Sequence, residues 1–423
     1  MLLNNKTFII FTIWLGFVFV SLHRICQFQG IFNLTADDNL NQLVWLSGNT
    51  FSFVKLSALN NGRIYSFINH PLLIAASGLI NNPVINILNM FTFWAAPVCF
   101  AYIFNKFINK FVFAFFLIVY WSLIPLWWDC MPPSSYPLIF YYPFLSLFIS
   151  AWTFHKSKCT DNLLKKIYLT LSISAFFLSI ASYEALTLLN AFLFFIYGIT
   201  YQTKNQQDSY CKIKNKFIQL LPYALCFLGY LSLYFCFRVL YPSNYDGNTI
   251  NGLFNFSAIL RTILFHSLSS ISVSHISTIL DIINSLNNNY GNFFAAGVSA
   301  LFTFFISYLC MMNIPYSQRH LIGHTITIGI LLIFISTILL AITEKYQAWS
   351  LNFSGYIDSR FAYFGVILII TNFCIFTRQF FFLKKENFLA ILISLIIAAS
   401  IAALNFFTSG LNDYVRSQML NSA

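Results

Sequence analysis

Two neighbouring carboxylates stand out among the side chains that can do chemistry. Asp37 and Asp38 lie side by side in the stretch TADDNLNQLVW, residues 35–45, of a chain that has only 12 acidic residues among 423. Adjacent negative charges repel each other, so such a pair needs a cation, a proton or a metal ion as a partner. An Asp that follows Thr35 can also cap the next helix. One Asp suffices for a cap, so the pair indicates a role beyond capping.

Further acidic residues lie beside apolar segments. A carboxylate next to lipid is costly and usually faces a protein interior or a water-filled site. We therefore expect the following acids to converge on one outward-facing pocket: Asp37, Asp38, Asp129, Glu184, Glu344 and Asp358. The alternative is that most of them are solvated loop residues.

The composition places these acids in a polytopic integral membrane protein. Hydrophobic residues make up 58% of the chain and charged residues only 8%, and repeated apolar runs approach the roughly 20 residues that span a bilayer. Such spans must be helical so that the backbone is hydrogen-bonded within lipid. We predict an all-α fold of about 11 transmembrane helices in a single transmembrane domain, 1–423. The predicted spans are 8–24, 83–104, 111–128, 137–154, 167–182, 185–201, 217–240, 293–312, 324–343, 361–377 and 387–407.

The distribution of charge orients these spans. Lys and Arg accumulate in cytoplasmic loops, and a cytoplasmic N-terminus puts 15 of the 23 basic residues inside and 9 of the 12 acids outside. The outer loops are then about 25–82, 241–292 and 344–360. The net charge of +11 is thus largely a topology signal, and we expect membrane lipid and no nucleic acid as a partner. The chain is then a multi-pass membrane protein with a cytoplasmic N-terminus.

The outer loops differ in character. In the first, the stretches 40–59 and 64–80 are too polar or too interrupted to span, and they are typical of helices at a membrane surface. The second either lies over the membrane face as a lid or contains a further short hairpin. The segment 167–201 must cross the membrane twice, with a turn at Ala181–Glu184 that brings Glu184 to the outer face.

Several classes of function are excluded or disfavoured. The nine Cys occur singly, without a Cys-x-x-Cys or a Cys/His cluster, which argues against zinc-finger and redox sites. No nucleotide-binding glycine motif occurs. We expect no resident cofactor, although a divalent metal at the aspartate pair stays an alternative. An active site on the outer face works without nucleotide sugars, so its activated substrate is lipid-borne, and a sugar on a polyprenyl phosphate fits this requirement.

Several motifs resemble a known enzyme class. The pair Asp37-Asp38 after one helix resembles the acidic pair of membrane glycosyltransferases of the GT-C class. DDNLNQLVWLSG followed by NNGRIYSFI at 60–68 is similar to serotype-converting O-antigen glucosyltransferases, and Ser182-Tyr183-Glu184 and Asp358-Ser359-Arg360 fit that layout. The chain departs from the pattern at Asn41-Gln42, where that family has a basic residue. Arg24 or Arg63 is a candidate for the missing charge.

The resemblance implies a reaction and its residues. Asp37 or Asp38 would be the catalytic base that deprotonates an acceptor hydroxyl of a glycan such as O-antigen, with inversion at the sugar carbon. The donor would be a hexose, such as glucose, on a polyprenyl phosphate. The implied substrate-binding residues are Arg24, Arg63, Asp129, Glu184, Lys345, Asp358 and Arg360.

Two other functions fit parts of the sequence. An O-antigen or capsule polymerase has a similar length and composition, but typically carries several arginines in two large outer loops, and 241–292 offers only Arg261. A flippase or transporter of lipid-linked glycans would have internal repeats and charged or broken helices at mid-membrane, and neither is clear here. We expect a transferase.

Overall fold

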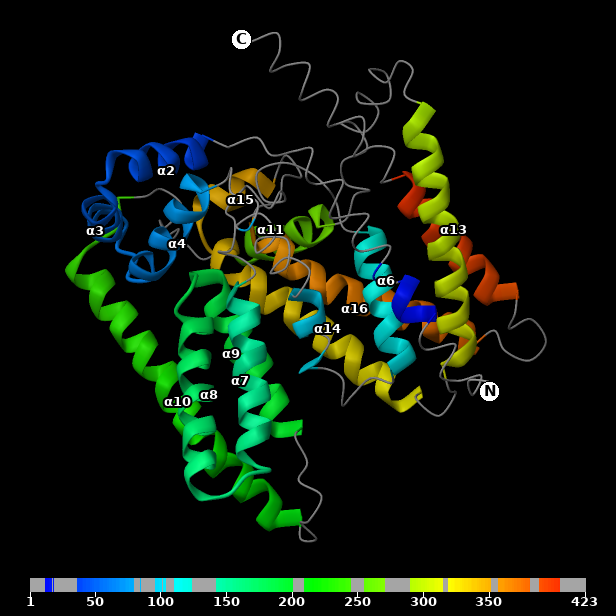
Figure 1. Cartoon of the computed structure of the whole chain (residues 1–423), viewed down its shortest axis with the longest axis horizontal. Coiled ribbons are helices and arrows are strands. Elements are labelled where there is room, and N and C mark those ends of the chain that lie inside the picture. The colour runs from blue at the N-terminus through cyan, green and yellow to red at the C-terminus, as the bar shows by residue number, and fades with distance from the viewer. Residues whose placement is uncertain are drawn as a thin grey trace.

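The structure of the chain is all-helical in the part that it describes. The computed structural model describes residues 12–16, 18, 36–79, 84, 96–100, 102–103, 110–123, 142–200, 209–244, 255–270, 290–314, 319–350, 357–380 and 388–403. The helices are α2 Ala36–Ser47, α3 Thr50–Asn61, α4 Ser66–Gly78, α6 Lys110–Leu123, α7 Tyr142–Ser157, α8 Asn162–Ile180, α9 Glu184–Thr200, α10 Ser209–Leu240, α11 Phe256–Ser269, α13 Tyr290–Asn313, α14 Arg319–Ala341, α15 Glu344–Ser350 and α16 Ile357–Phe380 (Figure 1). No element within these ranges is a β-strand.

Four described helices are long and apolar enough to cross a membrane. These segments are Leu163–Ile180, Phe217–Leu240, Ala296–Asn313 and Gly323–Ala341. Shorter apolar helices occupy Phe111–Leu123, Glu184–Ile199, Phe256–Ser269, Phe361–Thr377 and Phe388–Ala403. Apolar helices of 18 or more residues are typical of membrane spans, so these helices indicate an all-α membrane protein. Most of the expected spans 8–24 and 83–104 lies outside the described residues.

The helices α7, α8, α9 and α10 run side by side as a bundle (Figure 1). Small and hydroxyl-bearing residues join them, as is common between membrane helices. The Ser172 hydroxyl donates to the Ser150 carbonyl at 2.7 Å, and the Tyr223 hydroxyl of α10 donates to Ser172 Oγ at 2.7 Å. The three helices α7, α8 and α10 are thus linked through one serine.

The expected turn at Ala181–Glu184 is confirmed, because α8 ends at Ile180 and α9 begins at Glu184. Two side chains of α9 bond back to the end of α8. Thr187 Oγ1 donates to the Ile180 carbonyl at 2.7 Å, and Asn190 Nδ2 donates to the Ser179 carbonyl at 2.8 Å. These bonds satisfy carbonyls that a helix end leaves without a partner.

A second pair of long helices, α14 and α16, crosses at two glycines. A methyl group on Gly365 would lie 2.5 Å from the Gly329 carbonyl oxygen, so the crossing has no room for a side chain. Close approach at small residues is a general mode of membrane-helix packing. Near the crossing, Thr325 Oγ1 donates to Asn372 Oδ1 at 2.7 Å.

Within the second expected outer loop, residues 256–269 form α11, which packs against α14, α15 and α16. Its apolar face buries Ile259 and Ile263 against Ala341 at the end of α14. Ser269 and Ser359 share a hydrogen bond of 3.0 Å between their hydroxyl oxygens. This part of the loop is a single helix joined to the same end of α14 and α16.

The helices α2, α3 and α4 form a small layer at one end of the α7–α10 bundle (Figure 1). The sequence predicts one apolar stretch at 40–59, and the structure divides it between α2 and α3. The break lies at Gly48, whose φ of 70° is a left-handed conformation that favours glycine. The pattern of apolar residues does not reveal such a break.

Candidate functional site

The site begins at the turn between α3 and α4, in the sequence Asn60-Asn61-Gly62-Arg63. Gly62 ends α3 with a φ of 59° and a ψ of 35°. In this left-handed conformation, the amide of Arg63 donates to the Ala58 carbonyl at 3.0 Å, which is the usual way in which glycine closes a helix. Arg63 therefore leaves α3 in a fixed direction.

The same turn is fastened to the end of α10. A methyl group on Gly62 would lie 2.4 Å from the carbonyl oxygen of Tyr241, so the two backbones are in direct contact. The amide of Asn244 donates to the Asn60 carbonyl at 3.0 Å. Phe67 of α4 packs edge-to-face on Phe237 of α10, with ring centroids 6.3 Å apart. The layer of α2–α4 is thus held to the bundle at this turn.

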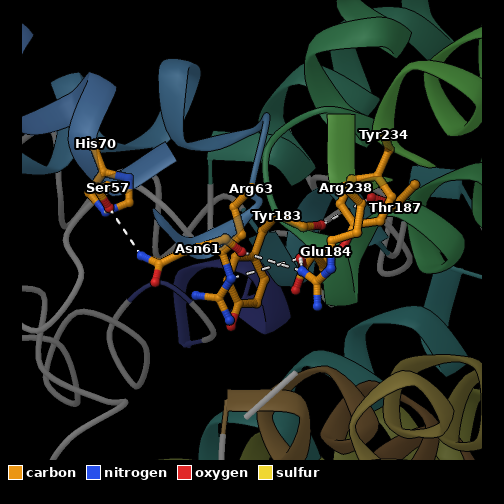
Figure 2. A network of polar contacts seen from close by, with 9 residues as sticks. All are labelled: Ser57, Asn61, Arg63, His70, Tyr183, Glu184, Thr187, Tyr234 and Arg238. Atoms are coloured by element: carbon orange, nitrogen blue, oxygen red, sulfur yellow. Dashed lines mark hydrogen bonds and ion pairs between the residues drawn. The ribbon is translucent and has the colours of Figure 1, made fainter. Parts of the chain in front are cut away.

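Three charged residues meet beside the turn (Figure 2). The Nε atom of Arg63 lies 3.8 Å from Oε1 of Glu184, and Nη1 of Arg238 lies 3.9 Å from the same oxygen. The Tyr234 hydroxyl donates to that oxygen at 2.5 Å. We call Arg63, Glu184, Tyr234 and Arg238 the charged junction; its members come from the α3–α4 turn, the start of α9 and the last two turns of α10.

The charged junction is half-buried. The side chains of Arg63, Glu184 and Arg238 are 19%, 22% and 24% exposed, so solvent screens the charges less than at an open surface. Among the described residues, the guanidinium groups of Arg63 and Arg238 both face the carboxylate of Glu184. Glu184 also occupies the first position of α9, where the helix dipole favours a negative charge.

Two aromatic side chains, those of Tyr65 and Tyr183, lie beside the charged junction. Tyr65 is buried, and its ring contacts the ring of Tyr183 edge-to-face at 5.5 Å. The guanidinium carbon of Arg63 lies 5.9 Å from the centre of the Tyr65 ring, within the range of a cation–π contact. Burial raises the pKa of the Tyr65 hydroxyl well above its usual value, so this hydroxyl stays protonated at neutral pH.

A second polar contact joins α3 to α4. Oγ of Ser57 lies 3.2 Å from Nε2 of His70, and Nδ2 of Asn61 donates to Ser57 Oγ at 3.4 Å (Figure 2). Burial, together with the positive charge of Arg63, lowers the pKa of His70 to about 4. His70 is therefore neutral at physiological pH, and it does not add to the charge of the junction.

The structure brings together two of the residues that the sequence singles out, Arg63 and Glu184. Lys345 lies half-buried on α15. For Asp37 and Asp38 in α2, and for Asp358 and Arg360 in α16, the helical backbone is described, but the side chains lie outside the described part. Arg24 and Asp129 lie wholly outside the described residues.

Three residues at this site, Arg238, Tyr234 and Tyr65, are not among those that the sequence motifs single out. A signal for the first two exists in the spacing of polar aromatic residues along α10. Tyr223 and Tyr230 are buried, and positions 234 and 238 continue the same helical face at intervals of four residues. The mean hydropathy of 217–240 does not reveal this polar face.

Among the described residues, no group of three or more His, Cys, Asp and Glu is placed to hold a metal ion. No protein-family model, no curated protein and no solved structure matches the chain. The function of the charged junction is therefore inferred from its geometry.

The Gly62 turn yields a testable prediction, for which a substitution at Gly48 provides the matched control. Gly62→Ala and Gly48→Ala both place alanine at a positive φ, which costs about 1–2 kcal/mol. Only the first also drives a methyl group into the Tyr241 carbonyl, because nothing lies within 4 Å of a methyl group at Gly48. We expect Gly62→Ala to separate the turn from α10 and to speed trypsin cleavage after Arg63 in detergent. Equal cleavage rates in both variants would contradict this contact.

The pKa of His70 yields a second prediction. Between pH 6.5 and about 4 the unfolded chain binds a proton at His70 that the folded chain does not, so stability falls as the pH drops through this window. The loss is at most about 3 kcal/mol. We expect His70→Gln, whose amide can still bond to Ser57, to weaken the dependence of the thermal midpoint on pH between 7 and 5.

His324 is exposed on α14 and provides the matched control. His324→Gln should leave the pH dependence as in the wild type. If His70→Gln behaves like His324→Gln, then the imidazole of His70 is not protected from protonation.

Proposed function

We propose that this chain is a membrane glycosyltransferase that moves a sugar, a hexose such as glucose, from a polyprenyl-phosphate donor to a cell-surface glycan such as O-antigen. It works at the periplasmic face of the bacterial inner membrane. In the proposal the chain crosses the membrane about 11 times with a cytoplasmic N-terminus.

The observation that carries the proposal is the meeting of Arg63 and Glu184 at 3.8 Å. Both are residues for which the resemblance implies substrate binding. They lie far apart in the sequence, and they come together half-buried where α2–α4 joins the ends of apolar helices. A lipid-linked substrate needs such a place, because its phosphate and sugar are polar while its chain stays in the membrane.

The position of α2 supports the same reading. The helix that carries Asp37 and Asp38 packs against α4, and α4 begins three residues after Arg63. One small layer thus carries the proposed base and one arginine of the junction. Gly78 of α4 contacts the ring of Trp45 in α2 so closely that a methyl group there would lie 2.1 Å from it.

The proposed chemistry is an inverting displacement. A carboxylate of Asp37 or Asp38 takes the proton of the acceptor hydroxyl, and the hydroxyl oxygen forms a bond to the anomeric carbon of the donor. The bond between that carbon and the phosphate oxygen breaks, and the polyprenyl phosphate leaves with the electron pair. Fixed positive charge at the leaving phosphate stabilises the transition state.

Removing the base tests the proposal. We expect Asp37→Asn or Asp38→Asn to lower sugar transfer by about 10²–10⁴-fold at unchanged protein levels in the membrane. The assay uses purified protein in detergent with a polyprenyl-phosphate hexose and the glycan acceptor. In detergent an enzyme still transfers sugar, whereas a transporter has no membrane to act across.

Asp161 precedes α8 and is exposed, so Asp161→Asn is the matched control and should transfer sugar at the wild-type rate. Near-normal product from both Asp37→Asn and Asp38→Asn would remove the pair from the mechanism. If the wild-type protein transferred no sugar from any polyprenyl-phosphate hexose tested, the proposed function would be rejected.

A further inference from the structure

The hydroxyl of Tyr65 is buried without a hydrogen-bond partner among the described residues. Tyr65 is 3% exposed, and its oxygen makes no hydrogen bond there. Leaving a buried hydroxyl without a partner costs free energy, so an orphaned donor of this kind calls for an explanation. The guanidinium carbon of Arg63 lies 5.9 Å from the centre of the Tyr65 ring, which places Tyr65 beside the charged junction.

The contacts from the two arginines of the junction to Glu184 are long. The distances of 3.8 Å and 3.9 Å to Glu184 exceed the roughly 2.7–2.9 Å of a charge-assisted hydrogen bond by about 1 Å. The contact from Arg238 Nη1 to the Asn61 carbonyl is also long, at 3.4 Å. Each guanidinium has five donor hydrogens. A ligand with several acceptor oxygens would form shorter bonds to both groups.

The donor groups of the junction favour an anion. The guanidinium of Arg238 makes only long contacts among the described residues, and the buried Tyr65 hydroxyl makes no hydrogen bond there. Glu184 is itself held by the Tyr234 hydroxyl at 2.5 Å. Guanidinium groups bind phosphate through parallel hydrogen bonds, so a phosphate suits these donors.

The exposed apolar side chains near Arg238 on α10 favour an anion that carries an apolar chain. Val239 and Leu240 follow Arg238 and are 78% and 71% exposed. On the preceding turns of the same span, Leu228 and Phe235 are also exposed, on the side of α10 that faces away from the bundle. A chain that runs along this face brings its phosphate to Arg238, where the apolar segment ends.

We propose that Arg238, Arg63 and Tyr65 form a binding site for the phosphate group of a lipid-linked substrate, with Arg238 and Tyr65 as substrate-binding residues. The Tyr65 hydroxyl donates to a phosphate oxygen, and the two guanidinium groups bind the others. The anion site stands on the geometry of the junction. Its assignment to the sugar donor rests on the proposed function.

The test measures binding of farnesyl phosphate to the full chain in phosphatidylcholine nanodiscs, with farnesol and inorganic phosphate as comparison ligands. We expect farnesyl phosphate to bind more tightly than either comparison ligand. Losing one charged contact weakens binding by about 10- to 100-fold, which is the expected effect of Arg238→Gln. Tyr65→Phe removes one neutral donor and should weaken binding by about 3- to 10-fold.

Tyr65→Phe also separates binding from folding, because its hydroxyl has no partner in the described part of the chain. We expect this variant without ligand to unfold at the wild-type temperature or above it, while its binding is weaker. A merely structural tyrosine would not change binding and stability in this way. Arg261→Gln on α11 and Tyr168→Phe on α8 remove an exposed arginine and a half-buried hydroxyl away from the junction, and both should bind as the wild type does.

Three results would overturn the inference. Farnesol that binds as tightly as farnesyl phosphate would show that no phosphate is recognised. Inorganic phosphate that binds as tightly as farnesyl phosphate would reject the lipid-linked ligand. Tyr65→Phe that binds farnesyl phosphate like the wild type would reject the site. Binding that depends on Arg238 and Tyr65 in a protein that transfers no sugar would support the site and count against the transferase.

Discussion

A single carboxylate, that of Glu184, holds together three parts of the chain. Arg63 comes from the layer of α2–α4, Arg238 and Tyr234 come from the end of α10, and Glu184 itself starts α9. Without Glu184, two guanidinium groups would face each other half-buried, and like charges in such a place repel strongly. Glu184 therefore acts together with the backbone contacts of the Gly62 turn in placing the small layer on the bundle.

The helix α10 has two faces with different tasks. One face buries Leu220, Tyr223 and Tyr230 in the bundle and ends in Tyr234 and Arg238, while the opposite face is apolar and exposed. A lipid-facing helix that carries its polar residues on the protein side is the usual arrangement in membranes. Here it delivers an arginine to the level at which the apolar span ends, beside the turn that carries Arg63. The proposed phosphate site follows from this geometry.

Much of the fold is predictable from the sequence, since long apolar runs leave a membrane chain few alternatives to helices. The turn before Glu184 follows from an apolar segment that is too long for one crossing. Arg63 and Glu184 attract attention singly, because charges are rare in this chain. Their pairing is a tertiary contact between distant segments, and no local pattern encodes it.

Other features could not be predicted, for identifiable reasons. The break at Gly48 depends on a positive φ, which a glycine permits without requiring it. A basic residue at the end of a span, such as Arg238, is expected to reflect membrane topology. Only the helical register that it shares with Tyr223, Tyr230 and Tyr234 shows that it faces the protein. The burial of the Tyr65 hydroxyl, without a hydrogen-bond partner among the described residues, is a property of packing alone.

The most direct test of this account is the energetic coupling between Glu184 and Arg238. A double-mutant cycle compares the unfolding free energies in detergent of the wild type, Glu184→Gln, Arg238→Gln and the double variant. The account predicts that the double variant is less destabilised than the sum of the single variants by about 0.5–3 kcal/mol, the range for residues within one network. Strictly additive effects would contradict it, because they would mean that the carboxylate does not hold the arginine.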